Sequence, residues 1–292
     1  SMWWKNSEDF MPTFVGADTT VLFIYSSLEL SENMNYAYGG RIFFDEFEEA
    51  GDIADTITTR GHEILNTVRL QGLDDHILLG DDFKNFVDTL PPLPELRIFT
   101  TFFHEHGTFD LNGHHLDVGS YMSKFETPRS LILDDSKVTV YLENTVIPEI
   151  SQRAFWLKAK NLQNFSAQNS LVAKKWIAGS IFTEEGNTLE YNDVSLYGIG
   201  DRLINKNNLV SYNVVNLYGS GERVMVDTIG VDVGSNSYLA DTIWIHGRNS
   251  GIRNKSNTHM VIMDGENNYI KDLHQVDYVY VNEPVGTIEG NN

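Results

Sequence analysis

The chain has 292 residues and no cysteine, and its 41 acidic and 21 basic residues give a formal net charge of −20 at pH 7. Because nucleic-acid affinity comes largely from lysine and arginine that neutralise phosphates, this charge excludes DNA and RNA as expected partners. No apolar run approaches the roughly 18 residues of a membrane-spanning helix, so we expect no membrane insertion.

The N-terminal half alternates between apolar segments and turn residues. Short runs of β-branched and aromatic residues predict strands, and these cover residues 19–25, 40–44, 76–80, 95–103, 129–135 and 137–143. The acidic stretch 44–57 is compatible with a short helix. Prolines restrict the connection 90–94, which is either a domain boundary or a long corner loop. We expect residues 3–160 to form a β-rich segment, made either of early rungs or of a capping subdomain.

Four of the nine histidines gather in the segment 103–117, FHEHGTFDLNGHHLD. His104 and His106 share one face of a predicted strand, and a turn at Asn112-Gly113 would fold the later histidines back towards them. Such a hairpin presents nitrogen and oxygen ligands of the kind that zinc prefers. The candidate metal ligands are His104, His106 and His114, with His115, Asp110 or Asp117 as further donors. The alternative is a hairpin whose histidines lie on the surface without a metal.

Acidic pairs offer a second place for a divalent ion. They are compatible with exposed calcium sites, although none has the spacing of an EF-hand loop: Asp74-Asp75, Asp81-Asp82 and Asp134-Asp135. The sequence therefore indicates no certain cofactor and leaves a divalent metal, calcium or zinc, open.

Residues 192–204, NDVSLYGIGDRLI, recur 21 positions later as NVVNLYGSGERVM, with seven identities in thirteen aligned positions. From residue 170 onward, short runs in which apolar and other side chains alternate end at Gly, Asn or Asp. This pattern is typical of strands that end at tight turns. The apolar pairs of five successive runs are offset by 21, 28, 18 and 18 residues, and they are Val194/Leu196, Val215/Leu217, Ile243/Ile245, Val261/Met263 and Val279/Val281. A coil of a parallel β-helix takes about 20 residues, whereas a propeller blade takes about 40 to 45. The predicted fold is all-β, a right-handed parallel β-helix (β-solenoid) over residues 161–292, with coils of about 18–28 residues.

If the apolar pairs face inward, the residues between and after them form two outward columns on one sheet. One column is Ser195, Asn216, Trp244, Ile262 and Tyr280; the other is Tyr197, Tyr218, His246, Asp264 and Asn282. Tyrosine and tryptophan combine an apolar face with a polar edge, a surface that stacks on sugar rings and hydrogen-bonds their hydroxyls. The candidate ligand-binding residues are Tyr197, Tyr218, Trp244, His246 and Tyr280. The alternative is that a loop or a neighbouring subunit covers this aromatic strip.

Asp201 and Glu222 occupy equivalent positions of the repeat, which would place their carboxyl groups about 5 Å apart. Such a pair can act as acid and nucleophile in glycoside hydrolysis, whereas a solvated patch with neighbouring arginines explains the same residues. The candidate catalytic residues are Asp201, Glu222, Asp264 and His246, the last as an acid or base. The chain has no Gly-rich phosphate loop, no GxSxG elbow and no HExxH helix, which excludes the commonest nucleotide-binding, serine-hydrolase and zinc-protease motifs.

The near-identical rungs, the Asn-rich corners and the aromatic strip resemble right-handed parallel β-helix proteins, among them phage tailspikes and fibres, bacterial surface adhesins and pectate-lyase-like enzymes. The resemblance covers residues 170–285 and is architectural, because no family active-site motif matches. It implies a polysaccharide ligand, an extracellular or virion-surface location and, as in the phage members, a homotrimer.

Three functions are compatible with these patterns. The first is a glycan-recognising β-solenoid module of a virion tail fibre or spike, or of a bacterial surface protein, that binds a cell-surface polysaccharide. The second is an enzyme, a polysaccharide hydrolase or lyase that uses the candidate carboxylates. The third is a structural spacer whose aromatic strip is an oligomer interface.

Overall fold

The structure is a computed structural model. It describes residues 2–3, 11–45, 54–85, 101–123, 125, 127–133, 135–141, 155–159, 162–163, 169–173, 180–186, 189–197, 202–206, 210–227, 240–253, 257–273, 275–282 and 287–290. Within these residues the chain is all-β and its sheets are parallel. They form no helix, and hence none long and apolar enough to cross a membrane.

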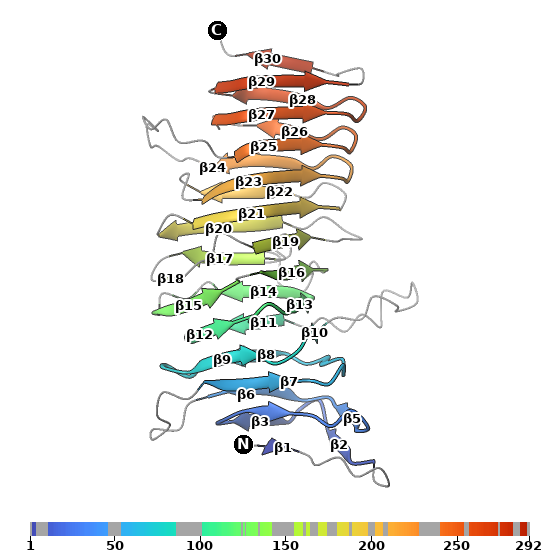
Figure 1. Cartoon of the computed structure of the whole chain (residues 1–292), viewed down its shortest axis with the longest axis vertical. Coiled ribbons are helices and arrows are strands. Elements are labelled where there is room, and N and C mark those ends of the chain that lie inside the picture. Colours follow the sequence, from blue (N-terminus) through green and yellow to red (C-terminus); the bar gives the residue numbers. More distant parts are fainter. Residues whose placement is uncertain are drawn as a thin grey trace.

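Three long parallel sheets run along the molecule, and the two chain ends lie at opposite ends of its long axis (Figure 1). The seven-stranded sheet contains β1 (Met2–Trp3), β4 (Leu28–Glu29), β7 (Asp55–Thr58), β9 (His76–Leu79), β12 (Gly107–Asp110), β15 (Arg129–Ile132) and β18 (Leu162–Gln163). The nine-stranded sheet contains β10 (Phe83–Asn85), β13 (His115–Val118), β16 (Ser136–Val140), β19 (Asn169–Ala173), β21 (Leu189–Leu196), β23 (Val210–Leu217), β25 (Ala240–Ile245), β27 (Asn257–Met263) and β29 (Gln275–Val281). The twelve-stranded sheet contains β3 (Val21–Ile24), β6 (Arg41–Phe44), β8 (Val68–Leu70), β11 (Thr101–His104), β14 (Ser120–Ser123), β17 (Phe155–Ala159), β20 (Ser180–Gly186), β22 (Arg202–Lys206), β24 (Arg223–Asp227), β26 (Gly251–Arg253), β28 (Tyr269–Leu273) and β30 (Thr287–Gly290). A separate pair joins β2 (Thr13–Gly16) to β5 (Asn35–Tyr38).

The chain visits the three long sheets in a repeating order. From β9 to β20 it passes from the seven-stranded to the nine-stranded to the twelve-stranded sheet four times, and from β21 to β30 it alternates between the last two. Each turn of the chain through these sheets, which we call a passage, therefore lies beside the previous one. Hydrogen bonds to the parallel strand of the neighbouring passage satisfy the backbone N–H and C=O groups along its edge. This pairing continues across residue 160, because β16 pairs with β19 and β17 pairs with β20.

The strands predicted in the N-terminal half are confirmed over β3, β6, β9, β11, β15 and β16. The predicted helix is wrong where the structure describes it, because Asp55–Thr58 forms β7 between β4 and β9. Ile57 is buried and pairs with Leu79, and this packing outweighs the acidic composition of the segment. Residues 46–53 of that stretch and the connection 90–94 lie outside the described residues.

The core is built from columns of inward side chains, one per passage. The predicted inward positions are confirmed in four strands, since each member of the pairs is at most 1% exposed: Val194/Leu196, Val215/Leu217, Ile243/Ile245 and Val261/Met263. The fifth pair is wrong as a buried pair. Val279 and Val281 continue the same columns in register, but they are 40% and 41% exposed because β29 is the last strand in the order of its sheet.

Replacing Phe102 by alanine should destabilise the protein by about 3–5 kcal/mol, because the ring is fully buried and its loss leaves a cavity. The ring stacks on Phe109 at 5.0 Å and on Tyr121 at 6.0 Å. Urea denaturation measures the effect. The control is Leu73→Ala, at a side chain that is 65% exposed, which should change stability by less than about 0.5 kcal/mol. Equal losses in the two variants would contradict this packing.

Candidate functional site

The residues of the two predicted columns lie in register on the nine-stranded sheet, but the expectation that all of them face solvent is wrong, because Ser195 and Asn216 are only 7% and 8% exposed. Successive strands pair Ser195 with Asn216, Asn216 with Trp244, Trp244 with Ile262 and Ile262 with Tyr280. The second column follows directly after the strand ends. Backbone N–H groups of its later members, Tyr218, His246, Asp264 and Asn282, donate to carbonyls of the preceding passage and hold the column in line.

Aromatic rings of the second column stack directly on one another. The Tyr197 and Tyr218 rings lie 4.6 Å apart, and Tyr218 and His246 lie 4.5 Å apart with an angle of 1° between their planes. Trp244 also stacks on His246, at 4.6 Å. Both faces of the Tyr218 ring are thus occupied, so this tyrosine offers a ligand its edge and hydroxyl. In this arrangement a sugar ring would meet the edge of Tyr218 and not its face.

The Tyr197 hydroxyl remains a neutral hydrogen-bonding group. Partial burial raises the pKa of Tyr197, and the neighbouring Tyr218 raises it further. Tyr197 and Tyr218 are nevertheless 44% and 41% exposed, so their hydroxyls are accessible to a ligand.

Asp264 connects the two columns. Its Oδ2 accepts a hydrogen bond from Trp244 Nε1 at 2.9 Å and lies 3.2 Å from His246 Nδ1. The carboxylate favours the tautomer in which Nδ1 carries the proton, which leaves the Nε2 lone pair as an acceptor. No described residue forms a hydrogen bond with His246 Nε2.

A groove of about 530 Å³ lies beside the ring stack. It is lined by Tyr197, Tyr218, Gly219, Ser220, His246, Gly247, Arg248, Gly265 and Glu266. Glycines form its floor because the passages approach too closely for a side chain. A Cβ atom on Gly247 would lie 1.7 Å from the Gly219 carbonyl oxygen, and one on Gly265 would lie 1.8 Å from that of Gly247. Only glycine therefore fits at these two positions between successive passages.

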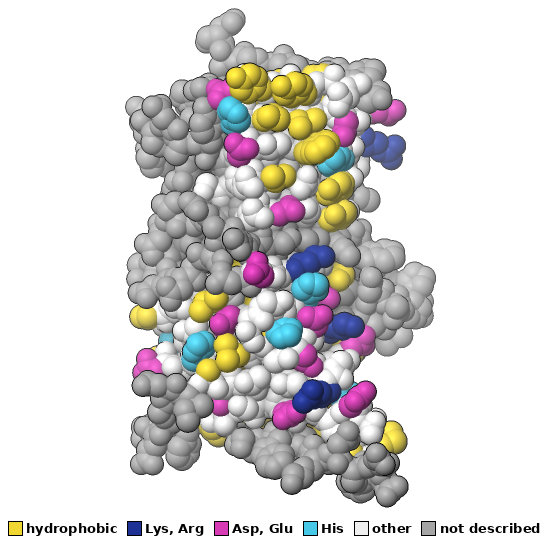
Figure 2. All heavy atoms as spheres, in the orientation of Figure 1, with side chains coloured by type: hydrophobic (Ala, Val, Ile, Leu, Met, Phe, Trp, Pro, Cys, Tyr) yellow, Lys and Arg dark blue, Asp and Glu magenta, His cyan; other side chains and the backbone are white. Residues whose placement is uncertain are grey.

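Next to the groove, exposed aromatic and half-buried aliphatic side chains form a patch that we call the platform. It consists of Trp244, Met260, Ile262, Tyr278 and Tyr280 on β25, β27 and β29. Figure 2 shows apolar side chains gathered on this face near the C-terminal end. Tyr278 and Tyr280 are each 53% exposed and Trp244 is 36% exposed. Among the described residues neither tyrosine is stacked face to face on another ring as Tyr218 is, although the Tyr278 ring meets that of His259 at an angle of 82°.

The predicted pair of catalytic carboxylates is not assembled by the described residues. Asp201 lies outside them. Glu222 is fully buried, where its Oε2 accepts a hydrogen bond from Gly219 N at 2.8 Å, and its own N–H donates to Ser250 Oγ. Glu222 therefore supports the groove floor from inside and does not face a ligand. Asp264 and His246 are the two predicted catalytic residues that the structure brings together.

The predicted metal ligands are not brought together either. The turn at Asn112-Gly113 is a corner between two sheets and forms no hairpin, since β12 belongs to the seven-stranded sheet and β13 to the nine-stranded sheet. His104 is buried, with Nδ1 3.0 Å from the Tyr121 hydroxyl and Nε2 3.2 Å from the Gly107 carbonyl. His106 is half-buried at the corner that follows β11.

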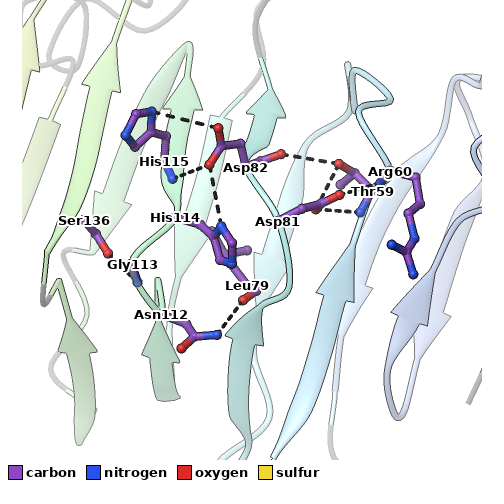
Figure 3. A network of polar contacts seen from close by, with 10 residues as sticks. All are labelled: Thr59, Arg60, Leu79, Asp81, Asp82, Asn112, Gly113, His114, His115 and Ser136. Atoms are coloured by element: carbon purple, nitrogen blue, oxygen red, sulfur yellow. Dashed lines mark hydrogen bonds and ion pairs between the residues drawn. The ribbon is translucent and has the colours of Figure 1, made fainter.

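His114 lies elsewhere, beside Asp82 and His115 (Figure 3). The Nδ1 atoms of the two histidines lie 3.7 Å and 4.0 Å from the Asp82 carboxylate, whose Oδ1 also accepts the His115 backbone N–H at 2.9 Å. Across the part of the chain that the structure describes, no group of three or more His, Cys, Asp or Glu side chains is arranged to hold a metal ion. The zinc hypothesis therefore finds no cluster there, and the calcium hypothesis finds none at Asp74, Asp75, Asp81 or Asp82.

Sequence reasoning missed the groove itself, including Arg248 and Glu266 at its rim. The sequence did contain a signal that could have predicted this groove. Each of the three column residues Tyr218, His246 and Asp264 is followed directly by glycine, and a small residue repeated at one position of successive rungs indicates close backbone contact.

Comparison with protein-family models, with curated proteins and with solved structures found no match to this chain.

The stability of the protein should depend on pH through His104. Burial lowers its pKa from 6.5 to about 3, so between these values the unfolded chain binds a proton that the native protein does not. Lowering the pH from 6.5 to 5 should remove about 1.5 kcal/mol of stability at this residue. Urea denaturation of His104→Gln should show a weaker dependence on pH than the native protein. The matched control His76→Gln, at an exposed histidine, should keep the native dependence; equal slopes for all three proteins would refute the assignment.

Proposed function

We propose that the chain is a right-handed parallel β-helix that binds a glycan on its nine-stranded sheet. The repeating visit to the same sheets and the parallel pairing of all their strands support the β-helix, as do the 18-residue offsets near the C-terminal end. The right hand is the one that crossover connections between parallel strands adopt almost without exception.

The observation that carries the glycan proposal is the continuity of the platform with the groove. The platform supplies exposed aromatic faces at Tyr278 and Tyr280, and the groove beside it supplies hydroxyl edges at Tyr197 and Tyr218. A sugar has apolar ring faces and a rim of hydroxyl groups, and this surface offers a partner for each. Arg248 and Glu266 at the groove add one charge of each sign, which suits a neutral sugar better than a polyanion.

The biological setting follows from this chemistry and from the β-helix resemblance. The ligand is a cell-surface polysaccharide, and the chain is a module of a virion tail fibre or spike, or of a bacterial surface protein, in an extracellular position. By the same resemblance it assembles as a homotrimer.

A second candidate function is favoured by the apolar character of the platform. Ile262 lies between Trp244 and Tyr280, and Met260 lies beside Tyr278. An apolar surface patch is also typical of a protein interface. In that case the platform holds copies of the chain together, and the protein is a spacer.

The substitution Tyr280→Ala separates these proposals. A tyrosine that is 53% exposed can be removed without damage to the core, and loss of one stacking surface should weaken glycan binding about tenfold, or about 1.4 kcal/mol. Calorimetric titration with bacterial surface polysaccharides that bind the native protein measures the change. The matched control is Tyr25→Ala, at a tyrosine 47% exposed near the other end of the chain, which should leave binding unchanged.

Light scattering on the same variants measures their oligomeric state and so tests the spacer proposal. If Tyr280→Ala binds the polysaccharide with native affinity but dissociates an oligomer, the spacer proposal replaces the glycan proposal. If the native protein binds no member of a broad polysaccharide panel, the glycan proposal fails directly.

A further inference from the structure

His246 is held more firmly than an ordinary surface histidine. Its ring lies between Tyr218 and Trp244, with ring centroids 4.5 Å and 4.6 Å away. The Asp264 oxygen nearest to Nδ1 is itself fixed by the Trp244 indole N–H. The His246 and Asp264 side chains are 24% and 29% exposed, so both are largely withdrawn from solvent. Position, ring plane and tautomer of the imidazole are therefore set before any ligand arrives.

A second histidine on the same sheet provides a comparison. His259 Nδ1 lies 2.9 Å from Asp277 Oδ2, and the Tyr278 ring meets it edge-on at 5.3 Å. This pair does not line the groove. His246 differs from His259 in that it combines a carboxylate partner, ring stacking and a place on the groove wall.

This arrangement presents a general base to whatever occupies the groove. The Asp264 carboxylate accepts the hydrogen bond from Nδ1–H of the imidazole. It also stabilises the imidazolium that forms when Nε2 accepts a second proton. Tyr218 and Arg248, which line the same groove, are hydrogen-bond donors for a developing negative charge on a substrate oxygen.

We propose that Asp264 and His246 hydrolyse an O-acyl ester carried by the glycan in the groove, an activity whose natural substrate rests on the proposed glycan binding. His246 Nε2 removes a proton from water as the water oxygen bonds to the ester carbonyl carbon, and the C=O π electrons move onto the carbonyl oxygen. The carbonyl then re-forms, the bond from carbon to the sugar oxygen breaks, and the imidazolium returns its proton to that oxygen. The products are a carboxylic acid and a free sugar hydroxyl, and the step needs no oxidant, reductant or cofactor.

The groove suits an ester better than a glycosidic bond. Glycoside hydrolysis uses two carboxyl groups on either side of the scissile bond. Among the described residues that line the groove, Glu266 alone carries a carboxyl group, while Glu222 is buried and Asp264 is engaged with His246 and Trp244. Ester hydrolysis requires one base and donors for the oxyanion, and both are present. An O-acyl sugar is also uncharged, as the acidic surface favours.

The test uses two substrates, p-nitrophenyl acetate and an O-acetylated bacterial surface polysaccharide. His246→Gln should lower kcat/KM for p-nitrophenyl acetate about 100-fold, the usual contribution of a general base. Asp264→Asn, at a positioning residue, should lower kcat and shift the pH dependence of kcat/KM. The matched control His259→Gln should retain the native rate within a factor of two. Thermal unfolding of all variants verifies that they fold.

The outcomes separate this inference from the glycan proposal. Native rates in a folded His246→Gln variant, or an equal loss in His259→Gln, would overturn it. A polysaccharide that is bound but keeps its acetyl groups, together with an inert small ester, would also overturn it while glycan binding stands. If the small ester is hydrolysed through His246 but no polysaccharide binds, the catalytic pair is upheld and the glycan proposal fails.

Discussion

Parallel pairing between successive passages of the chain is the constraint on which the rest of this structure depends. Backbone hydrogen bonds place each passage about 4.8 Å from the next and align residues at equivalent positions. The same alignment that buries Val194, Val215, Ile243 and Val261 in one column stacks Tyr197, Tyr218 and His246 in another. One strand register therefore determines both the buried and the outward side chains, and a shift of that register by one residue would exchange the two sets.

This spacing also determines what the surface can bind. Aromatic rings repeated at about 4.8 Å fit face to face and cover one another, so the stack exposes edges and hydroxyl groups. The ring column is interrupted on the platform near β29, because Ile262 stands between Trp244 and Tyr280. This interruption of the repeat places an aliphatic side chain between the two aromatic ones and is the basis of the proposed sugar-binding platform.

The stacking of passages also brings polar residues together. Asp264 bonds Trp244 and His246, which lie on the preceding passage, and a chain without stacked passages could not bring these three together in this way. Glu222 shows the opposite result. Its repeat position predicted a surface carboxylate, but the corner turns the side chain inward, where it accepts the Gly219 N–H beneath the groove.

The sequence by itself determined the strands of the repeat and their register, because the alternation of apolar and other side chains with period two is a local property that survives in any parallel stack. It failed at Val279 and Val281, whose burial depends on a neighbouring strand, and at Asp55–Thr58, where pairing outweighs composition. Only the tertiary structure decided that His104 is buried apart from His114, that Glu222 points inward, and that glycines 219, 247 and 265 open a groove beside His246. These features depend on how corners bend between sheets, and the direction of a bend is set by contacts between passages that are distant in the sequence.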